Sequence, residues 1–346
     1  MDFLVLGISF VLILIGAELF TNGIEWFGRK LELAEGAVGS VLAAVGTALP
    51  ETMIPIIAIG FAHGEGTNEI GVGAILGAPF MLATLAMFVT GLAVLWQARR
   101  RAEGDVMPVD SAVLSLDIRT FAISYAIAIG AAFLPLEPAW PKLVVAAILL
   151  LIYAGYVRRH FEADPDVDAA DLAPLRFRHL DRQRPPGTPP RLRMVNLQVL
   201  AALGLIVFGA IEFVDAVEHV AHTIGVSEVL LALVVAPIAT ELPEKFNSVI
   251  WVRQGKDTLA MGNITGAMVF QASIPTVVAL VLAPGAWVIA PGSYVAFASA
   301  GMAFLSTAAI FIPMARRGRL TGRGLLIGGA FYVVYLGIVV AAVLGG

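Results

Sequence analysis

The sequence predicts an all-α polytopic membrane protein, with ten transmembrane helices arranged as two inverted five-helix repeats. Three observations lead to this fold class. The 346 residues are 59% hydrophobic and only 14% charged, whereas a water-soluble domain carries about 25% charged residues. The Lys and Arg residues favour alternate connections between the apolar segments. A segment of the first half of the chain also recurs in the second half.

Ten windows of mostly apolar residues are long enough to cross a bilayer, which takes about 20 residues in a helix. They cover residues 3–20, 36–60, 68–97, 120–136, 139–157, 195–217, 228–252, 258–285, 288–314 and 324–344. A stretch rich in Pro, Asp and Arg separates five windows from five. We therefore expect a first five-span repeat at 1–157, a flexible connector at 158–194 and a second five-span repeat at 195–346.

The orientation follows from the basic residues. All but Lys142 and Lys245 of the 22 Lys and Arg residues fall in the connections that follow odd-numbered windows, with Arg119 at the edge of one of them. Cytoplasmic connections carry an excess of Lys and Arg. We expect a protein integral to the plasma membrane, with both termini outside and the long connector in the cytoplasm.

An internal repeat supports the two-fold plan. Residues 16–51 align with residues 209–244 without a gap, and both segments end in Thr-x-Leu-Pro-Glu. A second pair, GAILGA at 73–78 and GNITGA at 262–267, follows at a slightly different offset. Because each half crosses the membrane an odd number of times, the two copies would lie inverted relative to each other.

The repeated segment places one carboxylate in a span of each half, at Glu51 and Glu244. A charged side chain at that depth costs at least about 2.5 kcal/mol, so it should face a cavity, hold a cation or be protonated. The proline before each Glu cannot donate a backbone hydrogen bond, and Thr47 and Thr240 add one hydroxyl per half. Ca²⁺ and Na⁺ prefer such all-oxygen ligands. The alternative is that each Glu is a structural hydrogen-bonding residue, but its symmetric recurrence favours an ion site near the midplane.

The two segments, GTALPE at 46–51 and ATELPE at 239–244, resemble the signature repeats of the Ca²⁺/cation antiporter superfamily, the sodium/calcium exchangers and their proton-coupled relatives. The resemblance covers both halves and implies the ten-span inverted fold. It further implies that Glu51 and Glu244 are the metal ligands, which bind Ca²⁺ and share the site with Na⁺ or protons. Thr47 and Thr240 are expected to line that site.

The chain departs from the family pattern in ways that thin the ligand set. The Ser of the first signature is Ala48 here, and that of the second is Glu241. In the downstream motifs, Asn263 and Gln271 are the positions that keep a side-chain oxygen. A site with few ligand oxygens can still bind protons at its carboxylates, but it offers too few ligands for several Na⁺ ions. The expected ion-binding set is Glu51, Glu244, Thr47, Thr240, Glu241, Asn263 and Gln271.

Lys245 follows Glu244 directly and lies four residues after Glu241, a favourable spacing for an ion pair on a helix. Three interpretations stay open. Lys245 is a structural partner of Glu241, or an internal cation that compensates charge and couples to transport, or a side chain that extends toward the cytoplasm.

The function predicted from the sequence is secondary active cation antiport, with export of Ca²⁺ in exchange for Na⁺ or H⁺ by alternating access. The alternatives are a proton-coupled antiporter for another cation and a transport-inactive sensor or channel-like relative. We expect inorganic cations and membrane lipid as partners, and no cofactor. The net charge of −4 argues against nucleic acid, and the spans lack a Ser–His or metal arrangement typical of an enzyme.

Overall fold

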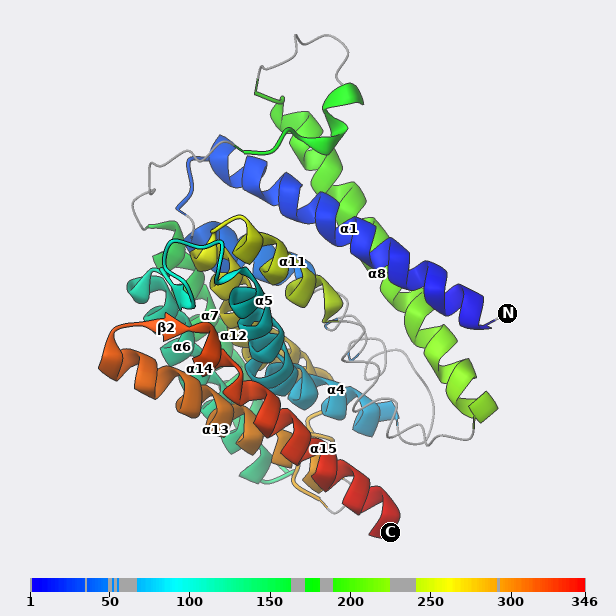
Figure 1. The fold of residues 1–346 in the computed structure, drawn as a ribbon. Coiled ribbons are helices and arrows are strands. Elements are labelled where there is room, and N and C mark those ends of the chain that lie inside the picture. The colour runs from blue at the N-terminus through cyan, green and yellow to red at the C-terminus, as the bar shows by residue number, and fades with distance from the viewer. Residues whose placement is uncertain are drawn as a thin grey trace.

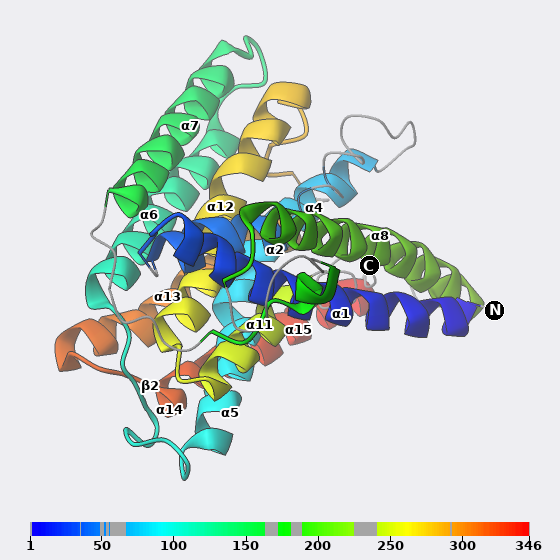
Figure 2. The ribbon, with the colours of Figure 1, turned by 90° about the horizontal axis from the view of Figure 1, so that it is seen from above.

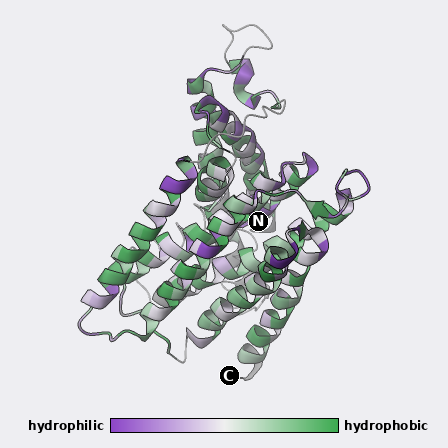
Figure 3. Cartoon of the chain, turned by 90° about the vertical axis from the view of Figure 1, so that its left-hand side faces the viewer, coloured by the Kyte–Doolittle hydropathy of each residue, from purple (hydrophilic) through white to green (hydrophobic). Residues whose placement is uncertain are grey.

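Helices dominate the computed structural model, which describes residues 2–34, 36–48, 52, 55, 67–162, 172–180, 189–224, 241–290 and 293–345. Within these ranges, eight helical segments are long and apolar enough to cross a membrane. They are Gly7–Lys30, Gly71–Gln97, Ser111–Phe133, Trp140–Phe161, Leu192–Gly209, Asp257–Leu282, Tyr294–Arg317 and Gly322–Ala342. Hydrophobic residues cover most of these helices, and hydrophilic stretches gather mainly in the connections (Figure 3). The helical membrane fold class is confirmed, whereas the count of ten stays a prediction because windows 36–60 and 228–252 lie partly outside the described residues.

The described elements follow one another along both halves of the chain. The first half contains α1 (Asp2–Lys30), the π-helix η1 (Ala37–Ala43), α2 (Ala44–Thr47), α4 (Thr67–Met81), the π-helix η2 (Leu82–Ala86), α5 (Met87–Gln97), β1 (Val106–Met107), α6 (Ser111–Gly130), η3 (Ala131–Phe133) and α7 (Trp140–Phe161). The second half contains η4 (Arg176–Leu180), α8 (Leu192–Ile224), α11 (Leu242–Arg253), α12 (Asp257–Leu282), α13 (Tyr294–Arg317), β2 (Leu320–Thr321), α14 (Gly322–Leu325) and α15 (Ile327–Gly345).

Helices α1 and α8 pack along each other on one side of the molecule (Figure 1). Two glycines that the internal repeat aligns make this contact close. A Cβ at Gly16 would lie 2.8 Å from the side chain of Ile206, and a Cβ at Gly209 would lie 3.0 Å from that of Ile13. Later residues of α1 thus meet earlier residues of α8, so the two helices run antiparallel. Small residues allow this approach in membrane proteins.

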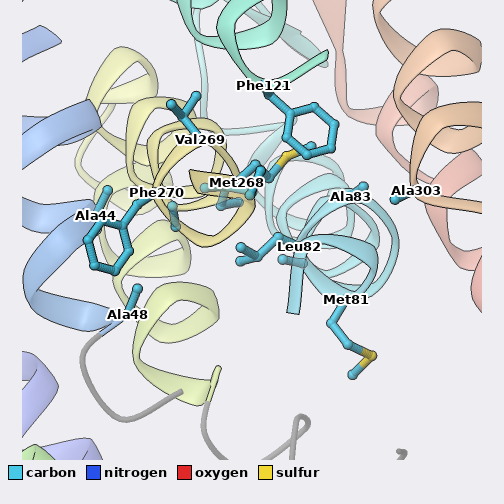
Figure 4. Close-up of a cluster of buried hydrophobic side chains, with 14 of the residues drawn as sticks. Ala44, Ala48, Met81, Leu82, Ala83, Phe121, Met268, Val269, Phe270 and Ala303 are labelled. Atoms are coloured by element: carbon cyan, nitrogen blue, oxygen red, sulfur yellow. The ribbon is translucent and has the colours of Figure 1, made fainter. Parts of the chain in front are cut away.

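Helix α12 lies at the centre of the bundle, in contact with α6, α7, η1, α11 and α4 (Figure 2). Its glycines allow η1 to cross it closely, since a Cβ at Gly266 would lie 2.0 Å from the backbone oxygen of Ser40. The GNITGA motif therefore serves close helix packing as well as supplying Asn263. An apolar cluster lies around α12 and the helices next to it (Figure 4). The labelled members are Ala44, Ala48, Met81, Leu82, Ala83, Phe121, Met268, Val269, Phe270 and Ala303.

Helix α1 extends to Lys30, beyond the predicted end at residue 20. The polar residues that ended the hydropathy window are satisfied by tertiary partners. The Thr21 hydroxyl donates to the side-chain oxygen of Asn247. Glu25 accepts hydrogen bonds of 2.7 Å from both Trp251 and Lys256. Burial with such partners removes the cost of keeping polar side chains in a membrane helix.

Helix α6 begins at Ser111, nine residues before the predicted window. The Asp110 carboxylate caps it by accepting from the backbone N–H of Ala112 at 2.7 Å, a preferred role for Asp. Arg119 consequently lies inside the helix and not at the edge of a connection. Nearby, β1 and β2 form a two-stranded antiparallel ribbon, with Val106 opposite Thr321, which the sequence did not predict.

Part of the predicted flexible connector is packed against the first and sixth predicted spans. Leu175 is buried beside Trp26 of α1 and Val195 of α8. The guanidinium group of Arg176 donates to Glu18 of α1 at 2.7 Å. The expectation of a flexible connector is therefore wrong for residues 172–180, where apolar and ionic contacts hold the segment.

Candidate ion-binding site

The candidate site lies at the start of α11, where Glu244 follows Pro243 in the first helical turn. Proline suits this position because the first N–H groups of a helix have no partner within the helix. The same N–H groups carry partial positive charge, which stabilises a carboxylate in the first turn. Glu244 is thus presented at a helix N-terminus inside the bundle, with only 1% of its surface exposed.

Asn263 of α12 joins the two signature segments. Its amide nitrogen donates to the backbone oxygen of Glu244 at 3.3 Å, and its amide oxygen accepts from the Thr47 hydroxyl at 3.3 Å. The hydroxyl of Ser248 donates to the same backbone oxygen of Glu244 at 2.8 Å. Three of the predicted site residues, Thr47, Asn263 and Glu244, therefore come together from α2, α12 and α11.

Gln271 lies about two helical turns beyond Asn263 on α12. Its amide nitrogen donates to the backbone oxygen of Ala48 at 3.4 Å, and Ala48 ends α2. Gln271 is 1% exposed. The second predicted amide thus lies beside the end of α2, next to the Thr47–Asn263 contact.

Several buried oxygens at this site have no hydrogen-bond donor within the described ranges. They are both carboxylate oxygens of Glu244, Oε1 of Glu241 and Oε1 of Gln271. An unpaired buried polar group costs about 1–3 kcal/mol, and a bound cation would remove that cost. Carboxylate and amide oxygens are ligands of Ca²⁺ and other hard cations. In the described part of the chain, no three His, Cys, Asp or Glu side chains form a metal-holding group, so a complete cation site needs further oxygens.

Glu241 and Lys245 form a buried ion pair, with 2.9 Å between Nζ of the lysine and Oε2 of the glutamate. The side chains of Lys245 and Glu241 are 7% and 1% exposed. The i, i+4 pair expected from the spacing is present, and the interpretation in which Lys245 extends toward the cytoplasm is wrong. The start of α11 therefore holds two carboxylates and one ammonium group close together.

Two predicted ligands, Glu51 and Thr240, lie outside the described residues. The meeting of Glu51 with Glu244 stays a prediction, and so does the place of Thr240 at the site.

A further buried carboxylate, Asp117 of α6, was not predicted. The hydroxyls of Ser40 and Thr265 donate to its Oδ2 at 2.8 and 2.6 Å. The Tyr156 hydroxyl donates to Oδ1 at 2.9 Å, and Nε2 of His160 lies 2.9 Å from the same oxygen. All five side chains are at most 2% exposed. Asp117 thereby connects α6 with η1, α7 and α12.

One signal in the sequence could have found Asp117. It interrupts the run LSLDIRTFAISYAI, and an acid in a membrane span normally needs a partner. The window drawn from residue 120 excluded it, because Asp117 and Arg119 lowered the local hydropathy.

Comparison with known proteins identifies the family. The profile described as sodium/calcium exchanger protein matches residues 1–160 and 195–344. CaxA of Alkalimonas amylolytica, which is assigned as an antiporter, is 28% identical over 289 residues, 80% of each chain. The inner membrane protein YrbG of Escherichia coli is 24% identical over 284 residues, 80% of this chain and 79% of YrbG.

Solved structures share the fold. The sodium-calcium exchanger NCX_Mj, soaked with 10 mM Na⁺ and zero Ca²⁺, superposes with a TM-score of 0.70 at 16% identity. The match covers 97% of this chain and 99% of that chain. Because the family profile spans most of both halves, the chain belongs to the sodium/calcium exchanger protein family.

Proposed function

We propose that the chain is a secondary active cation antiporter that exports Ca²⁺ in exchange for Na⁺ or H⁺. The ion would bind near the membrane midplane between Glu51 and Glu244, and the site would open to each side in turn. One observation carries the proposal: the Glu244 carboxylate is buried at a helix N-terminus with neither oxygen hydrogen-bonded in the described structure. Thr47 and Asn263, which reach the same place, would supply further oxygens.

Antiport follows from sharing these carboxylates. An empty and fully ionised acidic cluster is too costly to keep in a low-dielectric bundle. The site would therefore change its facing direction only when it is loaded, either with Ca²⁺ or with Na⁺ or protons. No resident cofactor is required, because an ion gradient supplies the driving force.

The antiparallel packing of α1 and α8 supports the proposed inverted repeat. Gly16 and Gly209 are equivalent positions of the two copies. Gly16 of α1 lies close to Ile206 of α8, and Gly209 of α8 lies close to Ile13 of α1. Inverted repeats bring two copies of one site together near the midplane. Together with the distribution of Lys and Arg, this favours a plasma-membrane protein with both termini outside and a cytoplasmic connector.

The thin ligand set keeps a second candidate open, a proton-coupled antiporter for another cation. Glu241 and Lys245 already place an extra charge pair beside Glu244, and the Lys245 ammonium group repels further cations at the site. This observation favours protons over several Na⁺ ions as the exchanged species.

Radioactive Ca²⁺ uptake into liposomes that contain the purified protein tests the function. We expect uptake that depends on an outward Na⁺ gradient or on a pH gradient and that stops when the gradient collapses. Uptake without any gradient coupling would indicate a channel, and absence of all cation flux would indicate a transport-inactive sensor. Gradient-driven flux of Mn²⁺ or Mg²⁺ without Ca²⁺ uptake would identify another cation as the substrate.

Replacing Lys245 with Gln is expected to change the pH dependence of exchange. The substitution removes the ammonium that lies 2.9 Å from Glu241, so the carboxylates bind protons and cations more tightly. Inhibition by protons should then begin at a proton concentration lower by about tenfold or more, equivalent to at least about 1.4 kcal/mol. The measurement is the initial rate of Ca²⁺ uptake between pH 5.5 and 9.

The double variant Glu241→Gln/Lys245→Gln is the matched control, because it removes both members of the pair and leaves the net charge unchanged. The proton concentration at which inhibition begins should stay close to that of the unmodified protein, while the maximal rate reports separately on Glu241 as a predicted ion ligand. If Lys245→Gln leaves both the rate and the pH profile unchanged, Lys245 has no charge-compensating role.

A further inference from the structure

A cavity of about 810 Å³ lies between α6, α13 and the β1–β2 ribbon, away from the residues of the ion-binding site. Its walls are largely apolar and include Leu114 and Ile118 of α6 and Phe304 and Phe311 of α13. Neighbouring residues of the same two helices are open to the surroundings, since Ile123 is 55% and Leu305 is 57% exposed. In a membrane, this cavity, which we call the α6–α13 groove, would face lipid chains.

Two arginines line the groove. Arg119 comes from α6, about 12 Å along the helix from its start at Ser111, and Arg319 comes from the turn between α13 and β2. Both are exposed. Neither side chain has a carboxylate or other hydrogen-bond partner within the described ranges, and no acidic residue lines the groove. The groove therefore carries two uncompensated positive charges.

A hydroxyl group in the groove is also unpaired. Thr307 of α13 lines the groove and is only 5% exposed, yet its Oγ1 has no hydrogen-bond partner in the described structure. The hydroxyl is a donor as well as an acceptor. A ligand in the groove would thus find an apolar wall, one buried hydroxyl and two guanidinium groups.

An unpaired arginine within a membrane span costs at least about 2.5 kcal/mol. Its long side chain can extend toward the headgroups, where a guanidinium group binds phosphate oxygens through paired hydrogen bonds. Basic pockets between transmembrane helices on the cytoplasmic side bind anionic lipid headgroups in this manner. Residues of two basic connections line the groove, 106–109 after Arg99–Arg101 and 318–320 within Arg316–Arg323, and we assign these connections to the cytoplasmic side.

We propose that the α6–α13 groove binds one anionic phospholipid. Its phosphate lies at Arg119 and Arg319, and an acyl chain lies along Phe304 and Phe311. The Thr307 hydroxyl donates to an ester oxygen of the same lipid. A bound lipid would hold α6, α13 and the β1–β2 ribbon together, and this role is independent of which cation the protein transports.

The test uses the purified full-length protein in a mild detergent with phosphatidylglycerol added. Lipid retention is measured by native mass spectrometry, and the shift of the melting temperature by thermal unfolding. We expect the protein to retain phosphatidylglycerol and to melt at a higher temperature in its presence, with little effect of phosphatidylcholine. Arg119→Gln and Arg319→Gln should each weaken retention about tenfold. Arg317→Gln is the matched control, because Arg317 is exposed at the end of α13 and does not line the groove.

Two further measurements keep the proposal falsifiable. Ala308→Phe fills the groove without changing its charge and should also reduce retention, which covers the case in which Arg119→Gln does not fold. Equal retention by the unmodified protein and by Arg319→Gln and Ala308→Phe would overturn the proposal. An equal rise of the melting temperature with millimolar glycerol phosphate, which has no acyl chain, would overturn it too, since it would identify a site for free phosphate.

Discussion

Replacing Glu244 with Gln is expected to abolish cation exchange while the protein stays folded. Gln has the same shape, but it lacks the negative charge that the proposed site presents at the start of α11. A unit charge about 4 Å from a cation contributes about 4 kcal/mol at an effective dielectric constant of 20. Loss of one carboxylate should therefore lower gradient-driven Ca²⁺ uptake at least about 100-fold. The measurement is Ca²⁺ uptake into liposomes at matched protein content.

Glu18→Gln is the control for this experiment. Glu18 also belongs to a membrane-spanning helix, but its side chain is 53% exposed and pairs with Arg176 of the connector. Exchange should survive this substitution. Glu51→Gln should resemble Glu244→Gln, because the internal repeat makes the two positions equivalent. Near-normal uptake by Glu244→Gln would remove the basis of the proposed site.

Replacing Asp117 with Ala is expected to cause a large loss of stability. The substitution leaves Ser40, Tyr156, His160 and Thr265 without their shared acceptor, and all four are buried. Each buried polar group that loses its hydrogen-bond partner costs about 1–3 kcal/mol. The melting temperature in detergent and the recovery of monodisperse protein should both fall sharply.

Two control variants test whether the loss of stability comes from the Asp117 hydrogen-bond network or from the removal of any carboxylate. Asp117→Asn keeps one acceptor oxygen and should lose less stability than Asp117→Ala. Asp105→Asn removes a carboxylate whose partner, Arg323, has a side chain that is 82% exposed, and it should change the melting temperature little. If Asp117→Ala melted at the temperature of the unmodified protein, the network would not hold the helices together.

The spans could be predicted closely wherever apolar residues ran without interruption. Window 68–97 matches the helical stretch from Thr67 to Gln97, and window 139–157 begins one residue before α7 and ends four residues before the end of that helix. The predictions failed where polar residues sit inside helices. Window 3–20 missed the C-terminal end of α1, and window 120–136 missed the N-terminal end of α6. The reason is that a hydropathy scale counts Glu25 and Asp117 as solvent-exposed residues. In the fold, both are buried with tertiary partners.

In the candidate site too, a contact between residues close in the sequence could be predicted, and a contact between distant residues could not be predicted from spacing. The spacing of Glu241 and Lys245 predicted their ion pair, since four residues place two side chains on one helical face. The contact between Thr47 and Asn263 could be expected only from the resemblance to a family, as 216 positions separate them.

The sequence alone determined that this protein is a helical membrane protein built on a repeated segment, because insertion responds to local apolar length and local positive charge. Only the tertiary structure decided which polar side chains from distant parts of the chain share hydrogen bonds. The donors to Asp117 lie 39 to 148 positions away along the chain, and the two arginines of the α6–α13 groove come from opposite halves. Contacts of this kind depend on how helices cross, which local composition does not encode.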